Sequence, residues 1–520
     1  MTATTLPQPG LFDVAGRTAL VIGLGASGVA MARWLARQGA RVCAADTRSA
    51  DGTDLPAWIA LRDSIDGVRY VDGAPWSDAW LEGVDLVAWS PGLSIEKGDS
   101  AQFHARAIAR GVAVAGELEL FAQALADLRE NGYAPQVIAV TGTNGKTTTT
   151  ALAAHLCREA GVEVACAGNI RPPMLDALRE ALDADRLPAV WALELSSFQL
   201  ALARSFAPDA AAIVNVDEDH LDWHASMRSY VQAKQRIYAH AALAVFDRGD
   251  ARSAPPAPGA SLRLVSFGAD APPAAGDFGI VREHGIDWLV HAQPEDDPTA
   301  GASARRRRTP AAFHVRRLMP ADALRIRGAH NRLNALAALA LCHAVGVPMA
   351  KMLHGLRSYA GEPHRCQLVA TIDGVEYYDD SKGTNVGATV AALRGLGRRC
   401  RLIAGGDGKG QDFSALVEPV RAHAASVYLI GVDAGRLQHA LEPSAVPITR
   451  CESLEAAVQR ASQDAAQGEA VLLSPACASL DMFRNYEHRG RCFVHAVRAL
   501  DPSGAAAGEA GHGEAGETPC

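Results

Sequence analysis

The feature that most restricts the fold is a unit that occurs three times: an apolar strand that runs directly into a glycine-rich turn. The three strands are Thr18–Ile22, Gln136–Val140 and Arg399–Ala404, and helical segments follow the first two turns at Val29–Gln38 and 147–160. Short strands that are apolar throughout are buried on both faces, which is typical of parallel sheets covered by helices. The sequence therefore predicts an α/β fold.

The chain length bounds the number of domains. A chain of 520 residues predicts about three domains, at roughly 150 residues each. Breaks in the pattern give domains over residues 1–113, 114–360 and 361–500. Residues 250–312 are rich in Ala, Pro, Gly and Arg and predict a partly mobile surface excursion of the middle domain. Residues 501–520 hold almost no large apolar side chain and predict a disordered tail.

Composition excludes several classes of protein. The net charge of −8 gives no basic surface for nucleic acid, and the short run Arg305–Arg308 is expected to be solvated. The ten cysteines lack the spacing of a zinc site, which favours a reducing compartment. No signal peptide and no run of about 18 apolar residues is present. We therefore predict a cytoplasmic, monomeric protein that acts on small molecules and does not insert into membranes.

The strongest local signal is a phosphate-binding loop after the second strand. Glycines let backbone N–H groups approach phosphate oxygens, and the helix that follows presents its positive N-terminus. Lys146 can neutralise the β- and γ-phosphates, and the Thr147 hydroxyl can bind Mg²⁺. Position 140 is Val, so the loop is a shortened form of the usual pattern. The predicted ATP-binding residues here are Gly142, Thr143, Asn144, Gly145, Lys146, Thr147 and Thr148.

Acidic residues follow two further strands of the middle domain. Ala189–Leu193 leads into Glu194, and Ala211–Val216 leads into Asp217–Asp222, which contains His220. Each acid by itself is more often a helix cap, but after a phosphate loop the pair predicts metal ligands. Lys234 lies in the helical segment Tyr230–Tyr238, where the sequence alone predicts an exposed lysine.

A second glycine-rich turn occurs in the first domain. Gly23–Gly28 follows a strand, opens a helix, and has Asp46 eighteen residues later, which fulfils the NAD fingerprint. The pattern requires only a diphosphate at the helix N-terminus and a ribose or base near Asp46. An NAD-dependent oxidoreductase and a protein that binds a UDP-sugar both remain open.

Polar turns also follow strands of the last domain. Pro363–Arg365 precedes a strand, and Asp379–Asn385 and 474–479 each follow one. Turns at the carboxyl ends of strands are where open α/β sheets bind ligands. Gly328–Asn334 opens a long Ala/Leu helix, in which Asn331 and Asn334 share one face, although Asn331 also suits a helix cap.

With these motifs assembled, residues from about 17 to 500 resemble the Mur ligase family. The shared motifs are GTNGKT at Gly142–Thr147, LELSSFQL around Glu194, EDH at Glu218–His220, and GAHNRLNALAA from residue 328. The last domain carries DDSKGTNVGAT, GGDGKGQDF and LSPACASLDMFRNYEHRG, which look like the motifs of members that add D-glutamate.

The resemblance implies three domains: a Rossmann-like N-terminal domain for a UDP-substrate, a central P-loop ATPase-type domain and a Rossmann-like C-terminal domain for an amino acid. It implies an ATP-dependent ligase that joins D-glutamate to UDP-N-acetylmuramoyl-L-alanine through an acyl phosphate, in peptidoglycan precursor synthesis. It further implies two Mg²⁺ ions and a carbamylated lysine at Lys234.

The resemblance also assigns residues. Asn334, Arg365 and Asp380 would join the phosphate loop in binding ATP. The expected UDP-substrate residues are Ala26, Ser27, Asp46, Thr47, Arg48, Ser90 and Asn169. The expected D-glutamate residues are Thr384, Lys409, Ser479 and Tyr486. The expected metal ligands are Thr147, Glu194, His220 and Lys234 as its carbamate. The expected catalytic residues are Lys146, His220, Lys234 and Lys382.

Three positions depart from the family pattern. Arg171 stands where a glycine is expected, Tyr486 stands where a relative has Phe, and residues 250–312 are longer and more basic. The alternatives are the NAD-dependent oxidoreductase, a folate-type polyglutamate ligase, which the complete N-terminal domain disfavours, and a nucleotide-binding scaffold without catalysis.

Overall fold

The computed structural model describes residues 14–49, 51–71, 75–256, 259, 261–295 and 312–501. Contacts divide the chain into two compact units, one of residues 1–321 and 333–358, the other of residues 322–332 and 359–520. The disorder predicted for the tail and the mobility predicted within 296–311 fall outside the described residues. No helix in the described part of the chain combines the length and apolar character needed to cross a bilayer.

The first sheet holds five strands in the order β3-β2-β1-β4-β5, all parallel. Its strands are β1 (Thr18–Ile22), β2 (Arg41–Ala45), β3 (Arg69–Tyr70), β4 (Leu86–Trp89) and β5 (Ala113–Gly116). Its helices are α1 (Ala26–Arg37), α2 (Pro56–Ser64) and α3 (Gly98–Ala109). The strand predicted at Thr18–Ile22 is β1. The proposed boundary at residue 113 coincides with the first residue of β5, and the domain limits stay predictions.

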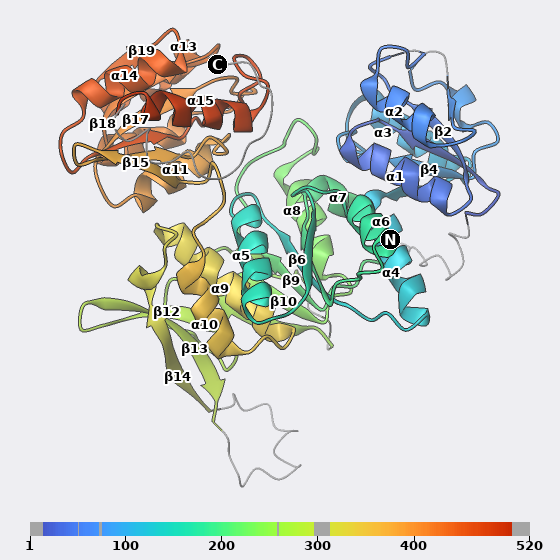
Figure 1. Cartoon of the computed structure of the whole chain (residues 1–520), viewed down its shortest axis with the longest axis horizontal. Coiled ribbons are helices and arrows are strands. Elements are labelled where there is room, and N and C mark those ends of the chain that lie inside the picture. The colour runs from blue at the N-terminus through green and yellow to red at the C-terminus, as the bar shows by residue number, and fades with distance from the viewer. Residues whose placement is uncertain are drawn as a thin grey trace. The chain divides into compact units, whose positions relative to one another are not determined.

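The second sheet of the same unit holds six parallel strands in the order β11-β10-β9-β6-β8-β7. They are β6 (Gln136–Thr141), β7 (Val164–Gly168), β8 (Val190–Glu194), β9 (Ala210–Ile213), β10 (Leu243–Asp247) and β11 (Arg263–Phe267). The helices are α4 (Glu117–Glu130), α5 (Lys146–Glu159), α6 (Met174–Asp183), α7 (Ser197–Ala201), α8 (Met227–Gln235), α9 (Ala329–Ala344) and α10 (Met349–Ser358). Helices α5 and α10 lie side by side (Figure 1).

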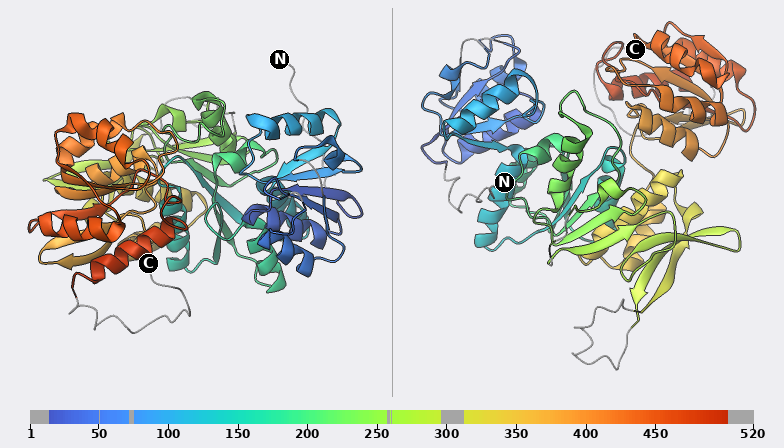
Figure 2. Two further views of the ribbon diagram at one scale, coloured as in Figure 1. Left: turned by 90° about the horizontal axis from the view of Figure 1, so that it is seen from above. Right: turned by 180° about the vertical axis from the view of Figure 1, so that it is seen from behind.

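The excursion of the middle domain contains a hairpin. Residues 278–294 contain two antiparallel strands, β12 (Phe278–Glu283) and β13 (Ile286–Pro294), and β13 also pairs with β14 (Phe313–Pro320). The chain reverses at His284 and Gly285, which both have positive φ angles, as two-residue hairpin turns require. The three strands form a small sheet of their own (Figure 2).

The second unit holds a six-stranded sheet in the order β15-β16-β20-β17-β18-β19, in which only β15 is antiparallel. The strands are β15 (Gln367–Ile372), β16 (Val375–Asp379), β17 (Cys400–Gly405), β18 (Ala424–Ile430), β19 (Ile448–Arg450) and β20 (Ala470–Leu473). The helices are α11 (Val386–Gly395), α12 (Val417–His423), α13 (Ala434–Leu441), α14 (Leu454–Asp464) and α15 (Tyr486–Arg498). The strand expected at Arg399–Ala404 is β17, one residue later.

A buried arginine joins two loops of the second unit. The Arg489 side chain on α15 is fully buried. It donates to the carbonyl of Ser381 at 2.8 Å, to the Ser381 hydroxyl at 3.0 Å and to the carbonyl of Cys477 at 3.1 Å. Burial lowers the pKa of the guanidinium to about 10, so it still carries its charge at neutral pH. One side chain therefore links the turn after β16 to the turn after β20.

Replacing this arginine is expected to destabilise the protein. Arg489→Met leaves carbonyls of both turns without their donor, and each buried unsatisfied group costs about 1–3 kcal/mol. Urea unfolding should show a loss of about 2–3 kcal/mol. Arg498→Met, at an exposed position of the same helix, is the control and should change stability by less than about 0.5 kcal/mol. Equal effects of the two changes would contradict the assigned role.

Glu117, the first residue of α4, is a buried acid that the sequence does not single out. It is 1% exposed, and its Oε1 accepts a hydrogen bond from the Leu175 backbone at 3.2 Å. Burial raises the pKa of the carboxyl to about 7, although bonds from Ser27 and from the backbone of Leu175 and Met174 act in the opposite direction.

The raised pKa predicts a pH-dependent stability. Between pH 4.5 and about 7 the folded protein keeps a proton on Glu117 that the unfolded chain has released, so the free energy of unfolding falls as pH rises through this window. Glu117→Gln cannot ionise and should melt at a higher temperature than the parent at pH 8, but at a similar temperature at pH 5. Exposed Glu82→Gln should behave alike at both pH values. A Glu117→Gln variant that melts lower than the parent at pH 8 would refute this prediction.

Candidate functional site

The phosphate loop connects β6 to α5. Gly145 precedes the helix with φ of +81°, which favours glycine. A Cβ on Gly145 would lie 2.4 Å from Oδ1 of Asn334, so this backbone and the Asn334 side chain are packed in contact. Asn334 is buried, and its Oδ1 accepts a hydrogen bond from the Thr149 hydroxyl at 3.3 Å. The structure thus brings Asn334, predicted from a distant segment, to the loop.

Two lysines meet at one carbonyl of this loop. Lys146 Nζ donates to the Gly142 carbonyl at 3.0 Å and to the Thr143 carbonyl at 2.8 Å. Lys234 Nζ donates to the same Gly142 carbonyl at 2.7 Å. Thr147 and Thr148 are buried at the start of α5. The loop therefore places two amine groups beside its own backbone, where an incoming anion would meet them.

Lys234 is the largest correction to the sequence analysis. The sequence predicted an exposed lysine, but its side chain is 1% exposed and its Nζ lies 4.5 Å from the centre of the Tyr230 ring. Burial, followed by the positive charge of Lys146, holds the pKa of the amine well below its usual value. A helical pattern cannot show that this face of α8 packs under the phosphate loop, since that contact joins residues 92 positions apart.

Glu194 and Asn169 lie together at the carboxyl edge of the second sheet. Glu194 ends β8 directly beside Val140 of β6, at the base of the phosphate loop, and is buried. Its Oε1 accepts a hydrogen bond from Asn169 Nδ2 at 2.6 Å, and its carbonyl accepts one from the Asn169 N–H at 2.7 Å. The turn that carries Asn169 continues into a cis peptide between Arg171 and Pro172.

His220 lies in the same neighbourhood. Its backbone has φ of +55°, and its ring centre is 4.8 Å from that of Phe198 and 6.3 Å from that of Tyr230. Desolvation lowers the pKa of the imidazole; Asp219 acts in the opposite direction, but the charge of Lys146 lowers the pKa further, so the neutral, metal-binding form is favoured. Among the described residues, no three His, Cys, Asp or Glu side chains are grouped as a ready metal site.

Two residues near this site were missed by the sequence analysis. Asn215 follows β9 and bonds to the backbone of the phosphate loop at Asn144. His224 is fully buried and lies 3.3 Å from Glu96 and 3.0 Å from the Ser197 hydroxyl. Both residues follow β9, the strand that leads to His220. An asparagine or a histidine at these positions gives no indication in the sequence that it makes these contacts.

The first sheet presents the residues predicted for a UDP-substrate except Asn169, which lies at the second sheet. Asp46 accepts from the Leu24 N–H at 2.6 Å and from the Arg48 guanidinium at 2.6 and 2.8 Å. Burial disfavours its ionisation, but the bonds from Arg48 and the Leu24 backbone outweigh this and lower the pKa of the carboxyl. Ser90 donates to the Gly23 carbonyl at 2.5 Å. Ala26 and Ser27 lie in the first turn of α1, and Thr47 is exposed beside Arg48.

Glycine is required at one position of this turn. A Cβ on Gly28 would lie 1.9 Å from the Gly23 carbonyl oxygen, so no larger residue fits there without moving the backbone. The close approach keeps the N-terminus of α1 next to the end of β1. This geometry suits a bound diphosphate of either UDP or NAD.

In the second unit most of the remaining predicted residues lie on turns after β16, β17 and β20, which are adjacent in its sheet, whereas Arg365 precedes β15 and Tyr486 begins α15. Asp380 is buried, and its Oδ2 accepts from the Ser474 hydroxyl at 2.7 Å. Burial raises the pKa of Asp380 to about 7, while the Ser474 bond and the nearby charge of Arg365 act against the rise. Arg365 and Asp380, predicted to bind nucleotide together, are therefore neighbours.

The residues predicted for D-glutamate are also brought together. Lys382 Nζ lies 5.1 Å from the centre of the Tyr486 ring, and the Thr384 N–H donates to the Lys382 carbonyl at 2.9 Å. Lys409 has φ of +47° and its N–H bonds to Asp407, which in turn pairs with Ala478 next to the buried Ser479. Three turns that are far apart in the sequence are thus hydrogen-bonded to one another.

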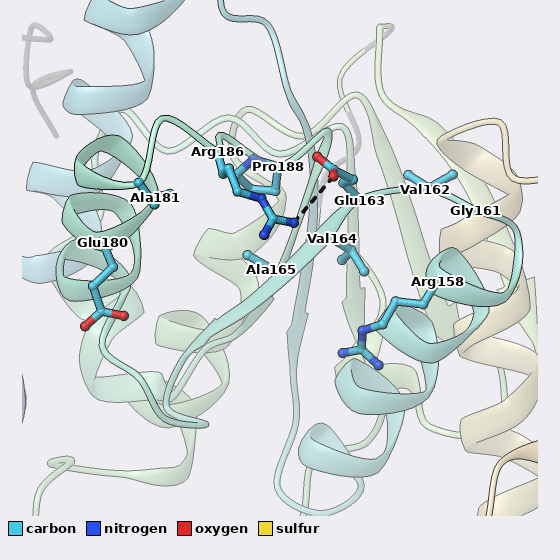
Figure 3. Close-up of a pocket in the computed structure, with 11 residues that line it drawn as sticks. Arg158, Gly161, Val162, Glu163, Val164, Ala165, Glu180, Ala181, Arg186 and Pro188 are labelled. Carbon is cyan, nitrogen blue, oxygen red and sulfur yellow. Dashed lines mark ion pairs between the residues drawn. The ribbon is translucent and has the colours of Figure 1, made fainter.

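A hollow in the first unit lies at the amino ends of β7 and β8 of the second sheet, away from the phosphate loop (Figure 3). It has a volume of about 560 Å³, and an ion pair between Glu163 and Arg186, 3.7 Å apart, borders it. Its Val164 pairs with Val190 at the amino ends of β7 and β8, whereas Glu194 ends β8 at the carboxyl edge. The hollow and the phosphate loop therefore lie at opposite edges of one sheet.

Comparisons with known families cover most of the chain. The model of the MurD-like N-terminal domain of Mur ligases matches residues 17–116. The model of the Mur ligase middle domain matches residues 140–342, and the model of the Mur ligase glutamate ligase domain matches residues 364–477.

Individual relatives agree with these matches. The chain is 56% identical over 491 residues to a UDP-N-acetylmuramoylalanine–D-glutamate ligase of Burkholderia mallei strain SAVP1, covering 92% of this chain and 96% of the relative. Two solved structures share the fold at 15% identity: the MurF ligase of Thermotoga maritima with ADP (TM-score 0.54, covering 94% of this chain and 96% of that one), and the Mycobacterium tuberculosis folylpolyglutamate synthase with ADP (TM-score 0.51, covering 74% and 95%). The chain belongs to the Mur ligase family.

Proposed function

We propose that this protein is an ATP-dependent, ADP-forming ligase that adds D-glutamate to UDP-N-acetylmuramoyl-L-alanine in peptidoglycan precursor synthesis. The observation that carries the proposal is the 56% identity to a ligase of that name over 92% of the chain, which includes the turns of the second unit. The fold alone would not separate this reaction from that of folylpolyglutamate synthase, because both relatives share it at low identity.

The chemistry begins with an inert group, since a carboxylate is a poor electrophile. The L-alanine carboxylate attacks the γ-phosphorus of ATP, and the bond from that phosphorus to the bridging oxygen breaks. ADP departs, and the substrate carboxylate has become an acyl phosphate. The D-glutamate amine then attacks the acyl carbon, loses a proton, and expels phosphate as the amide forms. The first step brings anions together, so we assign Lys146 and the N-terminus of α5 to offset their charge.

We assign Mg²⁺ to the edge of the second sheet beside the phosphate loop. The donors that fit it are the buried carboxylate of Glu194, the Thr147 hydroxyl and the neutral imidazole of His220. Bound there with ATP, the two Mg²⁺ ions of the proposal would supply charge stabilisation to the transferring phosphoryl group. Of these protein donors only Glu194 is anionic, so a second anionic oxygen from the protein would help to hold two divalent cations.

We propose that Lys234 meets this need as a carbamate. A neutral lysine amine attacks CO₂, a C–N bond forms, and one proton is released, which gives an anionic oxygen ligand. The support is the burial of Lys234 and its lowered pKa, because the neutral amine is the reactive form. An uncharged or anionic side chain at this position also removes the repulsion between Lys234 and Lys146.

We assign the amino acid to the joined turns of the second unit. Lys382 and Lys409 would pair with the carboxylates of D-glutamate, and Thr384, Ser479 and Tyr486 would hydrogen-bond to them. Asn334, Arg365 and Asp380 would bind the nucleotide, and Ala26, Ser27, Asp46, Thr47, Arg48, Ser90 and Asn169 would bind the UDP-substrate. We also propose that the protein acts in the cytoplasm as a monomer.

The NAD-dependent oxidoreductase explains less of the molecule. It uses Gly23–Gly28 and Asp46, but it gives no role to the phosphate loop, Glu194 or His220. A nucleotide-binding scaffold without catalysis likewise leaves Lys146 and Lys234 unexplained.

The proposed substrate is tested by phosphate release from ATP. With UDP-N-acetylmuramoyl-L-alanine present, D-glutamate should support release, and L-alanine or meso-diaminopimelate should be slower by at least about 100-fold. A site built for the two carboxylates of D-glutamate leaves polar groups unpaired with L-alanine, which has one, and does not match the wider spacing of the two in meso-diaminopimelate. UDP-N-acetylmuramate without its alanine serves as the control. Release with L-alanine or meso-diaminopimelate but not with D-glutamate would overturn the assignment.

The proposed carbamate is tested at Lys234. Lys234→Ala should abolish most turnover and leave binding of the UDP-substrate nearly unchanged, and acetate or formate should partly restore the rate by supplying an oxygen ligand. Lys234→Arg should stay inactive because a guanidinium keeps its charge and does not form the carbamate. Exposed Lys351→Ala is the matched control and should retain its activity. A Lys234→Ala variant with the parent's rate would rule out this role.

A further inference from the structure

The Asn215 side chain binds the backbone of one residue of the phosphate loop, Asn144, through two hydrogen bonds. Its Oδ1 accepts from the Asn144 N–H at 2.8 Å, and its Nδ2 donates to the Asn144 carbonyl at 2.9 Å. The Asn215 carbonyl also accepts from the Thr143 N–H at 2.9 Å. A side-chain amide that satisfies both the donor and the acceptor of one residue fixes the orientation of that residue's backbone.

This arrangement commits two N–H groups of the loop to Asn215. The N–H groups of Thr143 and Asn144 both point to Asn215, so they do not serve an anion. Helix α5, whose N-terminus suits an anion, begins two residues after Asn144, with Gly145 between them. The Asn144 carbonyl is also held by Asn215 instead of facing the position of an anion.

Further contacts join the phosphate loop to the segment that carries His220. The Thr143 hydroxyl donates to the Asp217 carbonyl at 3.1 Å and accepts from the Asp217 N–H at 2.9 Å. A Cβ on Gly142 would lie 2.5 Å from the Val214 side chain, so the two segments are in direct contact along their length. Moving one of them would move the other.

We propose that Asn215 is a positioning residue for the phosphate loop, which orients the N–H groups at the start of α5 towards a nucleoside triphosphate and keeps the loop in register with the His220 segment. This inference rests on the ATP-dependent activity proposed above. It concerns a side chain that would not itself touch the reacting atoms, so its effect should appear in nucleotide affinity.

The experiment measures Mg²⁺–ADP binding to the full chain by calorimetry. Asn215→Ala should weaken binding by about tenfold, and binding of UDP-N-acetylmuramoyl-L-alanine should stay within twofold of the parent. Asn131→Ala is the control, because Asn131 is exposed and donates only to a carbonyl of its own helix, at Asp127. Wild-type ADP affinity in Asn215→Ala would overturn the inference, as would an equal loss of affinity for both ligands.

Asn215→Asp separates positioning from a general loss of structure. A carboxylate keeps the acceptor for the Asn144 N–H but replaces the donor to the Asn144 carbonyl with a group that repels it. The ADP affinity of Asn215→Asp at pH 8 should therefore fall below that of the parent, and its affinity for UDP-N-acetylmuramoyl-L-alanine should stay within twofold.

An ADP affinity of Asn215→Asp equal to that of the parent would overturn the inference even if Asn215→Ala failed to fold. ADP binding needs neither D-glutamate nor turnover. Failure of the proposed ligation would therefore leave this result intact, and failure of this result would leave the amino-acid specificity untouched.

Discussion

The carbonyl of Gly142 is the point on which the site in the first unit depends. Two lysines from different helices donate to it, at 3.0 Å from Lys146 and 2.7 Å from Lys234. Burial makes a charge on Lys234 costly and the nearby charge of Lys146 adds to this cost, so the pKa of the Lys234 amine lies well below that of a solvated lysine. The packing of Lys234 against the phosphate loop thereby favours a neutral, nucleophilic amine at this position.

Parallel sheets supply the frame for this contact. The carboxyl ends of β6, β8 and β9 lie next to one another, so the phosphate loop, Glu194 and the segment leading to His220 reach the same edge. The second unit repeats the arrangement, because β16, β20 and β17 are adjacent and their turns bond to each other. The interiors of β6, β8, β9 and β20 are apolar, and polar side chains appear only at or beyond the ends of these strands.

The turns are held by buried polar side chains whose partners are mostly backbone groups. Asn215 fixes Asn144 in the phosphate loop, and Arg489 spans the turns after β16 and β20. Backbone groups at the ends of strands have lost their ladder partners, and a buried side chain that satisfies them makes the turn rigid. The residues expected to touch substrates are thus supported by residues to which the sequence analysis assigned no role.

The sequence by itself determined the α/β class, the positions of its first strands and the family, because apolar strands next to glycine-rich turns are local patterns. The phosphate loop, Glu194 and His220 were recognised for the same reason, and the resemblance supplied the rest of the predicted residues. Only the tertiary structure decided the burial of Lys234, the pairing of Asn215 with Asn144, the acid at Glu117 and the hairpin within 278–294. Lys234, Asn215 and Glu117 each meet partners more than 50 residues away, and desolvation and the pKa of a side chain depend on those partners and not on its neighbours in the chain.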